Sequence, residues 1–334
     1  MPLITDRQHV LEVYAAAAER RWVVPTFCAE NLTTMEAVLA GVKEHADRIG
    51  QPDLPVSVAI TNLYPHRSQT CNYTHTRQWD VGLRLFMADL AVLTSAGSPF
   101  RRLSVMSHLD HIQHDVDEPL LAWDMGQVSS IMFDASTLPL EQNIRKTAQF
   151  VEDHGLEIVI EGACDEIVDA GGAQISELTT PEKAERYTAG TGVDFIVANL
   201  GTEHRASAAD LCYHSGVARR IKERIGLKIV LHGCSSVPTD QLRGLFDDGI
   251  CKVNIWTALE RDASPALLAH MTANAAKVGG PDMARELAEH ELLGSAADLT
   301  SKAHLDYFTT VYRQRIVFER MKRIVLDYLE MWYV

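Results

Sequence analysis

Short runs of apolar and β-branched residues alternate along the chain with longer segments whose apolar residues recur at helical spacing. The short runs predict strands at 22–28, 56–61, 103–109, 130–133, 157–161, 195–200, 228–231 and 251–255. The longer segments predict helices at 32–45, 79–94, 118–126, 140–154, 181–191, 208–225 and 239–248. Eight strands alternating with helices are typical of a parallel sheet, so the pattern predicts an α/β fold of the TIM (β/α)8 barrel class.

Helical periodicity also extends beyond the repeated units at both ends of the chain. Residues 6–20 predict an added helix before the first strand, and residues 257–334 are longer than one barrel helix requires. We therefore expect one barrel domain over 1–334, with an N-terminal helix and a C-terminal helical extension over 257–334. The last segment, 307–333, has an apolar stripe that suits packing on its own barrel or a contact in a homodimer or homotetramer.

Composition and charge exclude several classes of protein. Lys and Arg total 31 against 45 Asp and Glu, and the resulting net charge of −14 disfavours nucleic acid and anionic membranes as partners. The six cysteines form no CxxC pairs, which fits a reducing compartment. No apolar stretch is long enough for a membrane span and no signal core precedes the first helix. We expect a cytoplasmic protein.

Three of the 14 histidines lie within four residues after the end of a predicted strand. His111 follows the third strand, His204 the sixth and His232 the seventh. Taken singly, each is more simply a surface or hydrogen-bonded side chain. However, the carboxyl ends of barrel strands meet at one face, where the active sites of such barrels lie. Three converging imidazoles match a catalytic zinc site, which leaves its remaining coordination position open.

Carboxylates occur at the ends of two other predicted strands. Glu161 ends the fifth predicted strand and Asp134 follows the fourth. Either side chain is a candidate metal ligand or a candidate partner that holds a ligand in place. Asp110 directly precedes His111 and is the candidate catalytic residue.

Several motifs occur in one order along the chain and together resemble a known family. They are Ser-His-Leu-Asp-His at 107–111, Met-Phe-Asp-Ala-Ser at 132–136, Thr-Gly-Val-Asp-Phe-Ile-Val-Ala-Asn-Leu-Gly-Thr-Glu-His at 191–204, Leu-His-Gly-Cys-Ser at 231–235 and Lys-Val-Asn-Ile at 252–255. In order and spacing they resemble the class II fructose-bisphosphate and tagatose-bisphosphate aldolases. Many motifs in one order carry far more weight than any single motif.

The resemblance implies a zinc-dependent barrel, usually dimeric or tetrameric, that cleaves a ketose bisphosphate to dihydroxyacetone phosphate and an aldehyde. It places His111, His204 and His232 on the family's zinc ligands, with one Zn²⁺ per chain, and a monovalent cation is a further candidate. Asp110 falls on the aspartate that handles the proton of the aldehyde oxygen. Glu161 resembles the acidic position after the fifth strand.

The chain departs from the family pattern where the family binds a phosphate group. The family's His-Gly after the sixth strand becomes His204-Arg205, and a small or acidic residue after the eighth becomes Trp256. The large side chain of Trp256 and the guanidinium group of Arg205 are expected to change the shape and the hydrogen-bond donors of the anion site. The candidate substrate-binding residues are Asn31, Arg205, Gly233, Ser235, Ser236, Asn254, Trp256 and Thr257. We therefore expect a sugar, sugar phosphate or keto acid other than fructose 1,6-bisphosphate as substrate.

Three alternatives remain open at the level of sequence. A metal-dependent epimerase or isomerase uses the same enediolate without breaking the same bond. A Schiff-base aldolase would use Lys228 or Lys252 as nucleophile. A non-catalytic barrel would bind a metabolite for regulation.

Overall fold

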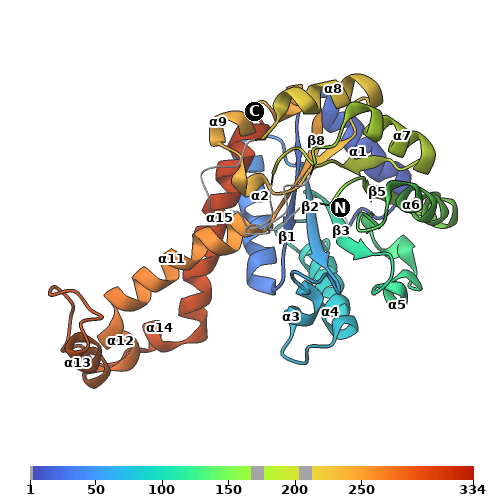
Figure 1. The fold of residues 1–334 in the computed structure, drawn as a ribbon. Coiled ribbons are helices and arrows are strands. Elements are labelled where there is room, and N and C mark those ends of the chain that lie inside the picture. The colour runs from blue at the N-terminus through green and yellow to red at the C-terminus, as the bar shows by residue number, and fades with distance from the viewer. Residues whose placement is uncertain (1–2, 167–176, 203–212) are drawn as a thin grey trace.

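The structure, a computed structural model, describes residues 3–166, 177–202 and 213–334. Within these residues, eight parallel strands close into a barrel in which each strand pairs with its neighbours in chain order (Figure 1). They are β1 Val24–Cys28, β2 Pro55–Thr61, β3 Ser104–Gln113, β4 Ser130–Asp134, β5 Val159–Ala163, β6 Phe195–Val197, β7 Ile229–Leu231 and β8 Ile250–Ile255. The predicted TIM barrel is confirmed.

Helices surround the barrel and continue beyond it (Figure 1). Those of the barrel are α1 Arg7–Glu19, α2 Leu32–Ile49, α3 Gln69–Tyr73, α4 Trp79–Leu93, α5 Glu118–Leu121, α6 Leu140–His154, α7 Pro181–Thr191, α8 Ser215–Ile225, α9 Thr239–Leu242 and α10 Leu245–Asp248. Those of the extension are α11 Thr257–Ala273, α12 Ala275–Gly279, α13 Pro281–Glu289, α14 Leu305–Phe308 and α15 Thr310–Trp332. The added N-terminal helix and the C-terminal helical extension were both predicted.

Some element boundaries differ from the predicted ones. Strand β3 continues to Gln113, four residues beyond its predicted end, and β5 continues to Ala163. The expectation that Glu161 ends the fifth strand was therefore wrong, since it lies in the middle of β5. The predicted helix 118–126 is divided into α5 and the 3₁₀-helix η1 Met125–Gln127. The start of the predicted helix 208–225 lies outside the described residues.

The strands are buried on both faces, as expected for a parallel sheet that is covered by helices. One apolar cluster extends from the barrel strands to the inner sides of the surrounding helices and to α15. Such a barrel interior is a packed core, which leaves the strand ends as the place for chemistry. No helix in the described part of the chain combines the length and the apolar composition needed to cross a membrane.

The C-terminal extension leaves the barrel and returns to it. Helices α11 to α14 project away as an arm, and α15 runs back beside α2 (Figure 1). The two helices approach closely at Gly41, where an added Cβ would lie 2.8 Å from Val325 Cγ1. At the end of the chain the buried Tyr333 donates its hydroxyl hydrogen to the carbonyl of Pro55 at 2.6 Å. The extension is thus fixed to the barrel at its far end.

Candidate active site and metal centre

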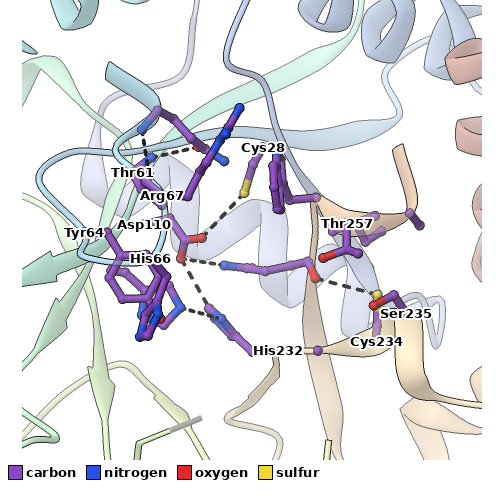
Figure 2. Close-up of a pocket in the computed structure, with 17 residues that line it drawn as sticks. Cys28, Thr61, Tyr64, His66, Arg67, Asp110, His232, Cys234, Ser235 and Thr257 are labelled. Atoms are coloured by element: carbon purple, nitrogen blue, oxygen red, sulfur yellow. Dashed lines mark hydrogen bonds and ion pairs between the residues drawn. The ribbon is translucent and has the colours of Figure 1, made fainter. Parts of the chain in front are cut away.

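A pocket of about 590 Å³ opens at the carboxyl ends of the strands (Figure 2). It is lined by residues from the ends of β1, β2, β3, β7 and β8, from the segment after β2, and from the start of α11. Asp110, His111 and His232 lie together on its wall. This is the end of the barrel where chemistry was expected.

An irregularity in β3 directs two consecutive side chains into this pocket. Side chains alternate along a strand, so a regular strand would place Asp110 and His111 on opposite faces. The pairing of β3 with β4 shifts register between Leu109 and Ile112, and His111 has a φ of 50°. A bulge of this kind re-aims a side chain, and a non-glycine residue at positive φ costs about 1–3 kcal/mol. The neighbouring residues must therefore stabilise this backbone conformation of His111.

The two imidazoles of His111 and His232 are arranged as a pair of metal ligands would be. Nε2 of His111 lies 3.1 Å from Nδ1 of His232, and the ring planes are 87° apart. Two nitrogens that ligate one tetrahedral zinc at about 2.0–2.1 Å lie about 3.4 Å apart. Together with Asp110, their potential ligand atoms all lie within 4.8 Å of one another. Among the described residues, this nitrogen and oxygen donor set fits Zn²⁺.

The third predicted ligand, His204, lies outside the described residues. The chain leading to it is fixed near the site, because the Thr202 hydroxyl donates to the carbonyl of His232 at 2.7 Å. In the sequence, His204 is two positions after Thr202, which contacts the candidate ligand His232.

Asp134 contacts His111 and orients its ring. Its Oδ2 lies 3.0 Å from His111 Nδ1 and also accepts from Gln113 Nε2 at 3.1 Å. Burial favours a raised pKa for Asp134, but the hydrogen bond and charge of His111 and the bonds from Ser136 outweigh it and lower the pKa. A carboxylate on Nδ1 leaves Nε2 of His111 directed at the metal position. Of the two roles considered for Asp134, its position suits the one that holds a ligand in place.

Asp110 is buried in the pocket wall among polar partners. Asn254 Nδ2 donates to its Oδ1 at 2.9 Å, and the Cys28 thiol is 3.5 Å from its Oδ2 (Figure 2). Burial alone would raise its pKa, but the charges of His111 and His232 and the nearby imidazole of His108, whose Nε2 is 3.7 Å from Oδ1, hold the pKa well below its usual range. The carboxylate is a candidate proton acceptor in the pocket wall.

Glu161 lies deeper in the barrel than the pocket. Its Oε1 is 2.6 Å from Lys252 Nζ, and neither side chain is exposed to solvent. The described cluster of potential ligands comprises Asp110 and two histidines and does not include Glu161. The ion pair also places Lys252 away from the pocket wall, and Lys228 precedes β7 at the opposite end of the barrel. Neither lysine is placed for a Schiff base.

Comparison with known proteins agrees with this geometry. A family model described as "Fructose-bisphosphate aldolase class-II" matches residues 8–308. This chain belongs to that family. The fructose-bisphosphate aldolase of Campylobacter jejuni has a TM-score of 0.72 at 17% identity, with 97% of this chain and 94% of that chain covered. The YdjI aldolase of Escherichia coli K12 has a TM-score of 0.63 at 19% identity, with 99% and 97% covered.

At these identities the structural likeness shows the shared fold, while the family match extends over most of the chain. Membership in the class II aldolase family supports an aldolase-type lyase.

The buried Lys252–Glu161 pair gives a prediction about the stability of this member of the class II aldolase family. Lys252→Met is expected to lower the free energy of unfolding by about 3–5 kcal/mol, because it leaves the Glu161 charge buried without its partner. Adding Glu161→Gln to that variant should recover part of the loss, since the uncompensated charge is then removed. Urea unfolding of the single and double variants measures both effects. An unchanged midpoint for Lys252→Met would contradict the prediction.

The predicted substrate-binding residues do not all line the pocket. Gly233, Ser235, Asn254, Trp256 and Thr257 line the pocket. Asn31 does not line it, because its side chain accepts from the Thr34 N–H at 2.9 Å and caps α2. Ser236 ends the short 3₁₀-helix η2 Cys234–Ser236. Arg205 lies outside the described residues.

Sequence reasoning missed the segment between β2 and α3. Tyr64, His66 and Arg67 line the pocket (Figure 2). Arg67 is hydrogen-bonded through Nε to Glu30 Oε2 at 2.8 Å, and its guanidinium lies 5.3 Å from the ring centroid of Trp256. These residues follow the end of β2. The rule that residues after strand ends lie at the active-site face of the barrel therefore applies to them as it does to the histidines. The segment lacks a helical or strand pattern, and it was passed over for that reason.

Proposed function

We propose that this protein is a zinc-dependent class II aldolase that cleaves or forms a carbon–carbon bond in a hydroxyketone other than fructose 1,6-bisphosphate. The observation that supports it best is the pair of imidazole nitrogens 3.1 Å apart beside the buried carboxylate of Asp110. A metal position and a proton acceptor are thereby placed on one wall of one pocket.

In this proposal His111 and His232 hold the metal together with His204. The bound Zn²⁺ supplies a Lewis acid that stabilises the enediolate charge of the donor fragment when the carbon–carbon bond breaks. Asp134 keeps the ring of His111 in place through Nδ1.

Asp110 carries the proton in the proposed reaction. In cleavage its carboxylate accepts the proton of the hydroxyl on the carbon that becomes the aldehyde, and in synthesis it returns that proton. Asn254 Nδ2 fixes one carboxylate oxygen, and the Cys28 thiol, whose pKa is raised by burial and by Asp110, stays protonated beside the other. Burial of Asp110 restricts water at the site.

The remodelled mouth of the pocket supports a substrate other than the usual bisphosphate. Trp256 fills space beside the helix start where the family binds phosphate, and the guanidinium above it is already paired with Glu30. A paired cation is a poorer phosphate ligand than a free one. We infer a ketose or hydroxy-keto acid whose donor fragment carries a carboxylate or lacks phosphate.

A retro-aldol screen tests the proposal. Phosphorylated and unphosphorylated ketoses and hydroxy-keto acids are incubated with the protein, with and without a chelator, and the products are identified. We expect aldehyde release from an unphosphorylated or carboxylated substrate that stops on chelation. Turnover of fructose or tagatose 1,6-bisphosphate at about 1–10³ per second would contradict the substrate assignment. Epimerised product without cleavage would favour an epimerase, and absence of tightly held zinc would favour a binding protein.

We further propose that the protein is a homo-oligomer in which the arm contacts a second copy. The arm exposes large apolar side chains, including Leu268 and Leu305, which are 67% and 63% exposed, and Val311 at the adjoining start of α15 is 68% exposed. Leu305 and Val311 line one groove where the arm meets α15. In the described residues, the buried apolar core of the arm centres on three alanines. A second copy packed on the arm would therefore cover apolar side chains that the arm's own core does not bury.

Placing charges in this groove should dissociate the oligomer. The double variant Leu305→Asp with Val311→Asp is expected to be monomeric, because two carboxylates would be buried in an apolar contact. Light scattering after size exclusion gives the mass of wild type and variant. Leu156→Asp, at a side chain that is 95% exposed on the barrel, is the control and should leave the mass unchanged. A wild-type monomer would contradict the proposal.

A further inference from the structure

We propose that Tyr64 is a positioning residue for the metal ligand His111, an inference that rests on the zinc site proposed above. The ring of Tyr64 stacks on the imidazole of His111, with centroids 4.3 Å apart and planes inclined by only 10°. Among aromatic pairs, such stacked contacts add attraction beyond the area that they bury. Tyr64 thereby covers one face of the candidate ligand.

His111 needs support from outside its own strand. Its backbone lies in the left-handed region within the β3 irregularity, a conformation that persists only where neighbours impose it. Asp134 restrains the ring in its own plane through Nδ1 at 3.0 Å, and the ring of His232 meets it edge-on at 4.8 Å. The stack of Tyr64 adds a contact on the face of the ring, in a direction different from these two contacts.

The segment that carries Tyr64 is fixed to the end of β3 through one buried carboxylate. Asp117 Oδ1 accepts from Asn62 Nδ2 at 2.8 Å and from the Leu63 N–H at 3.1 Å. Its other oxygen, Oδ2, accepts from the Gln113 N–H at 2.8 Å. Asp117 is fully buried, so these bonds are shielded from water. Asp117 thus links the residues immediately before Tyr64 to those just after His111.

On the other side of Tyr64 the chain turns back sharply. The Arg67 N–H donates to the Tyr64 carbonyl at 3.1 Å, and the Ser68 hydroxyl donates to the same oxygen at 3.3 Å. The turn and the Asp117 bonds fix the Tyr64 backbone from both directions. Ordinary packing of a pocket wall does not require bonds to the strand that holds the ligand.

Metal affinity tests the proposal, because a mere pocket wall would affect substrate binding and leave metal binding unchanged. Zinc dissociation constants are measured by competition with a chromophoric chelator for wild type, Tyr64→Phe and Tyr64→Leu. We expect Tyr64→Phe to match wild type, since it keeps the stack, and Tyr64→Leu to bind zinc about 10–100-fold more weakly, as for other groups that orient ligands. The absorption spectrum of the Co²⁺-loaded protein should change in Tyr64→Leu alone.

His66→Leu is the matched control, because His66 belongs to the same segment and pocket but meets the edge of Tyr64, with ring centroids 4.9 Å apart. It should retain wild-type zinc affinity. Equal affinity in Tyr64→Leu and wild type, or equal weakening in Tyr64→Phe or His66→Leu, would overturn the proposal. Thermal unfolding identifies variants that fail to fold.

A second readout does not require metal. In metal-free protein the His111 ring protons, assigned by comparison with His111→Gln, should be shifted upfield by the stacked ring in wild type and Tyr64→Phe, and not in Tyr64→Leu. Absence of that difference would also overturn the proposal. Failure of wild type to bind zinc would instead contradict the proposed function, so the two outcomes are distinguishable.

Discussion

Replacing Asp110 by asparagine is expected to lower kcat about 10²–10⁴-fold, the usual contribution of a positioned acid or base. Asparagine has nearly the same shape but cannot accept the proton of the substrate hydroxyl. The native carboxylate lies in the pocket wall, where Asn254 Nδ2 donates to its Oδ1 at 2.9 Å and holds it in place. The rate is measured on the best substrate from the retro-aldol screen, with zinc in excess.

The control is Asp115→Asn, at an exposed carboxylate in the connection after β3. It should retain wild-type turnover. Zinc content decides how a loss in Asp110→Asn is interpreted. A variant that holds a full equivalent of zinc but turns over slowly supports a proton carrier, whereas loss of zinc in step with activity indicates a ligand. Full activity in Asp110→Asn would refute the role.

The fold could be predicted from sequence because it depends on periodicity that persists over many residues. Each strand is buried on both faces, so it reads as a continuous apolar run, and each is separated from the next by an amphipathic helix. The ends of the strands were predicted less well where polar residues of the site interrupt the apolar pattern. Strand β3 continues through Asp110 and His111, polar residues that follow its predicted end at Leu109. They occur there because they line a barrel mouth.

The candidate site was predicted in part, for a related reason. The convergence of Asp110, His111 and His232 follows from the rule that strand ends meet at one face. The bulge that turns Asp110 and His111 to the same side depends on one backbone dihedral angle, which no residue type specifies on its own. Contacts between distant segments were equally hidden, such as that of Tyr64 with His111.

Glu161 shows how a sequence position can mislead. It was placed at a strand end because the apolar run stops there, yet it pairs with Lys252 inside the barrel. A charged residue interrupts an apolar run whether it faces the site or a buried partner of opposite charge. Only the pairing across the barrel, 91 residues apart in sequence, separates these two cases.

Replacing His232 by alanine is expected to weaken zinc binding more than about 100-fold, because loss of a ligand should exceed the effect of losing a group that merely orients one. Turnover should fall about 10³-fold or more at limiting zinc, since the Lewis acid contributes several kcal/mol. Chelator competition and metal analysis measure the first effect, and the retro-aldol assay the second. His290→Ala, at an exposed histidine of the arm, is the control and should behave as wild type.

Comparison of His232→Ala with Asp134→Asn separates a ligand from its support. Asp134 lies on Nδ1 of His111, on the side of the ring away from His232 Nδ1, so Asp134→Asn should bind zinc only about 10–100-fold more weakly. Excess zinc should then restore most of its turnover, because all the proposed ligand atoms remain. His232→Ala should stay impaired even at saturating zinc, since the geometry at the metal has changed. Equal rescue of both variants would mean that His232 does not bind the metal.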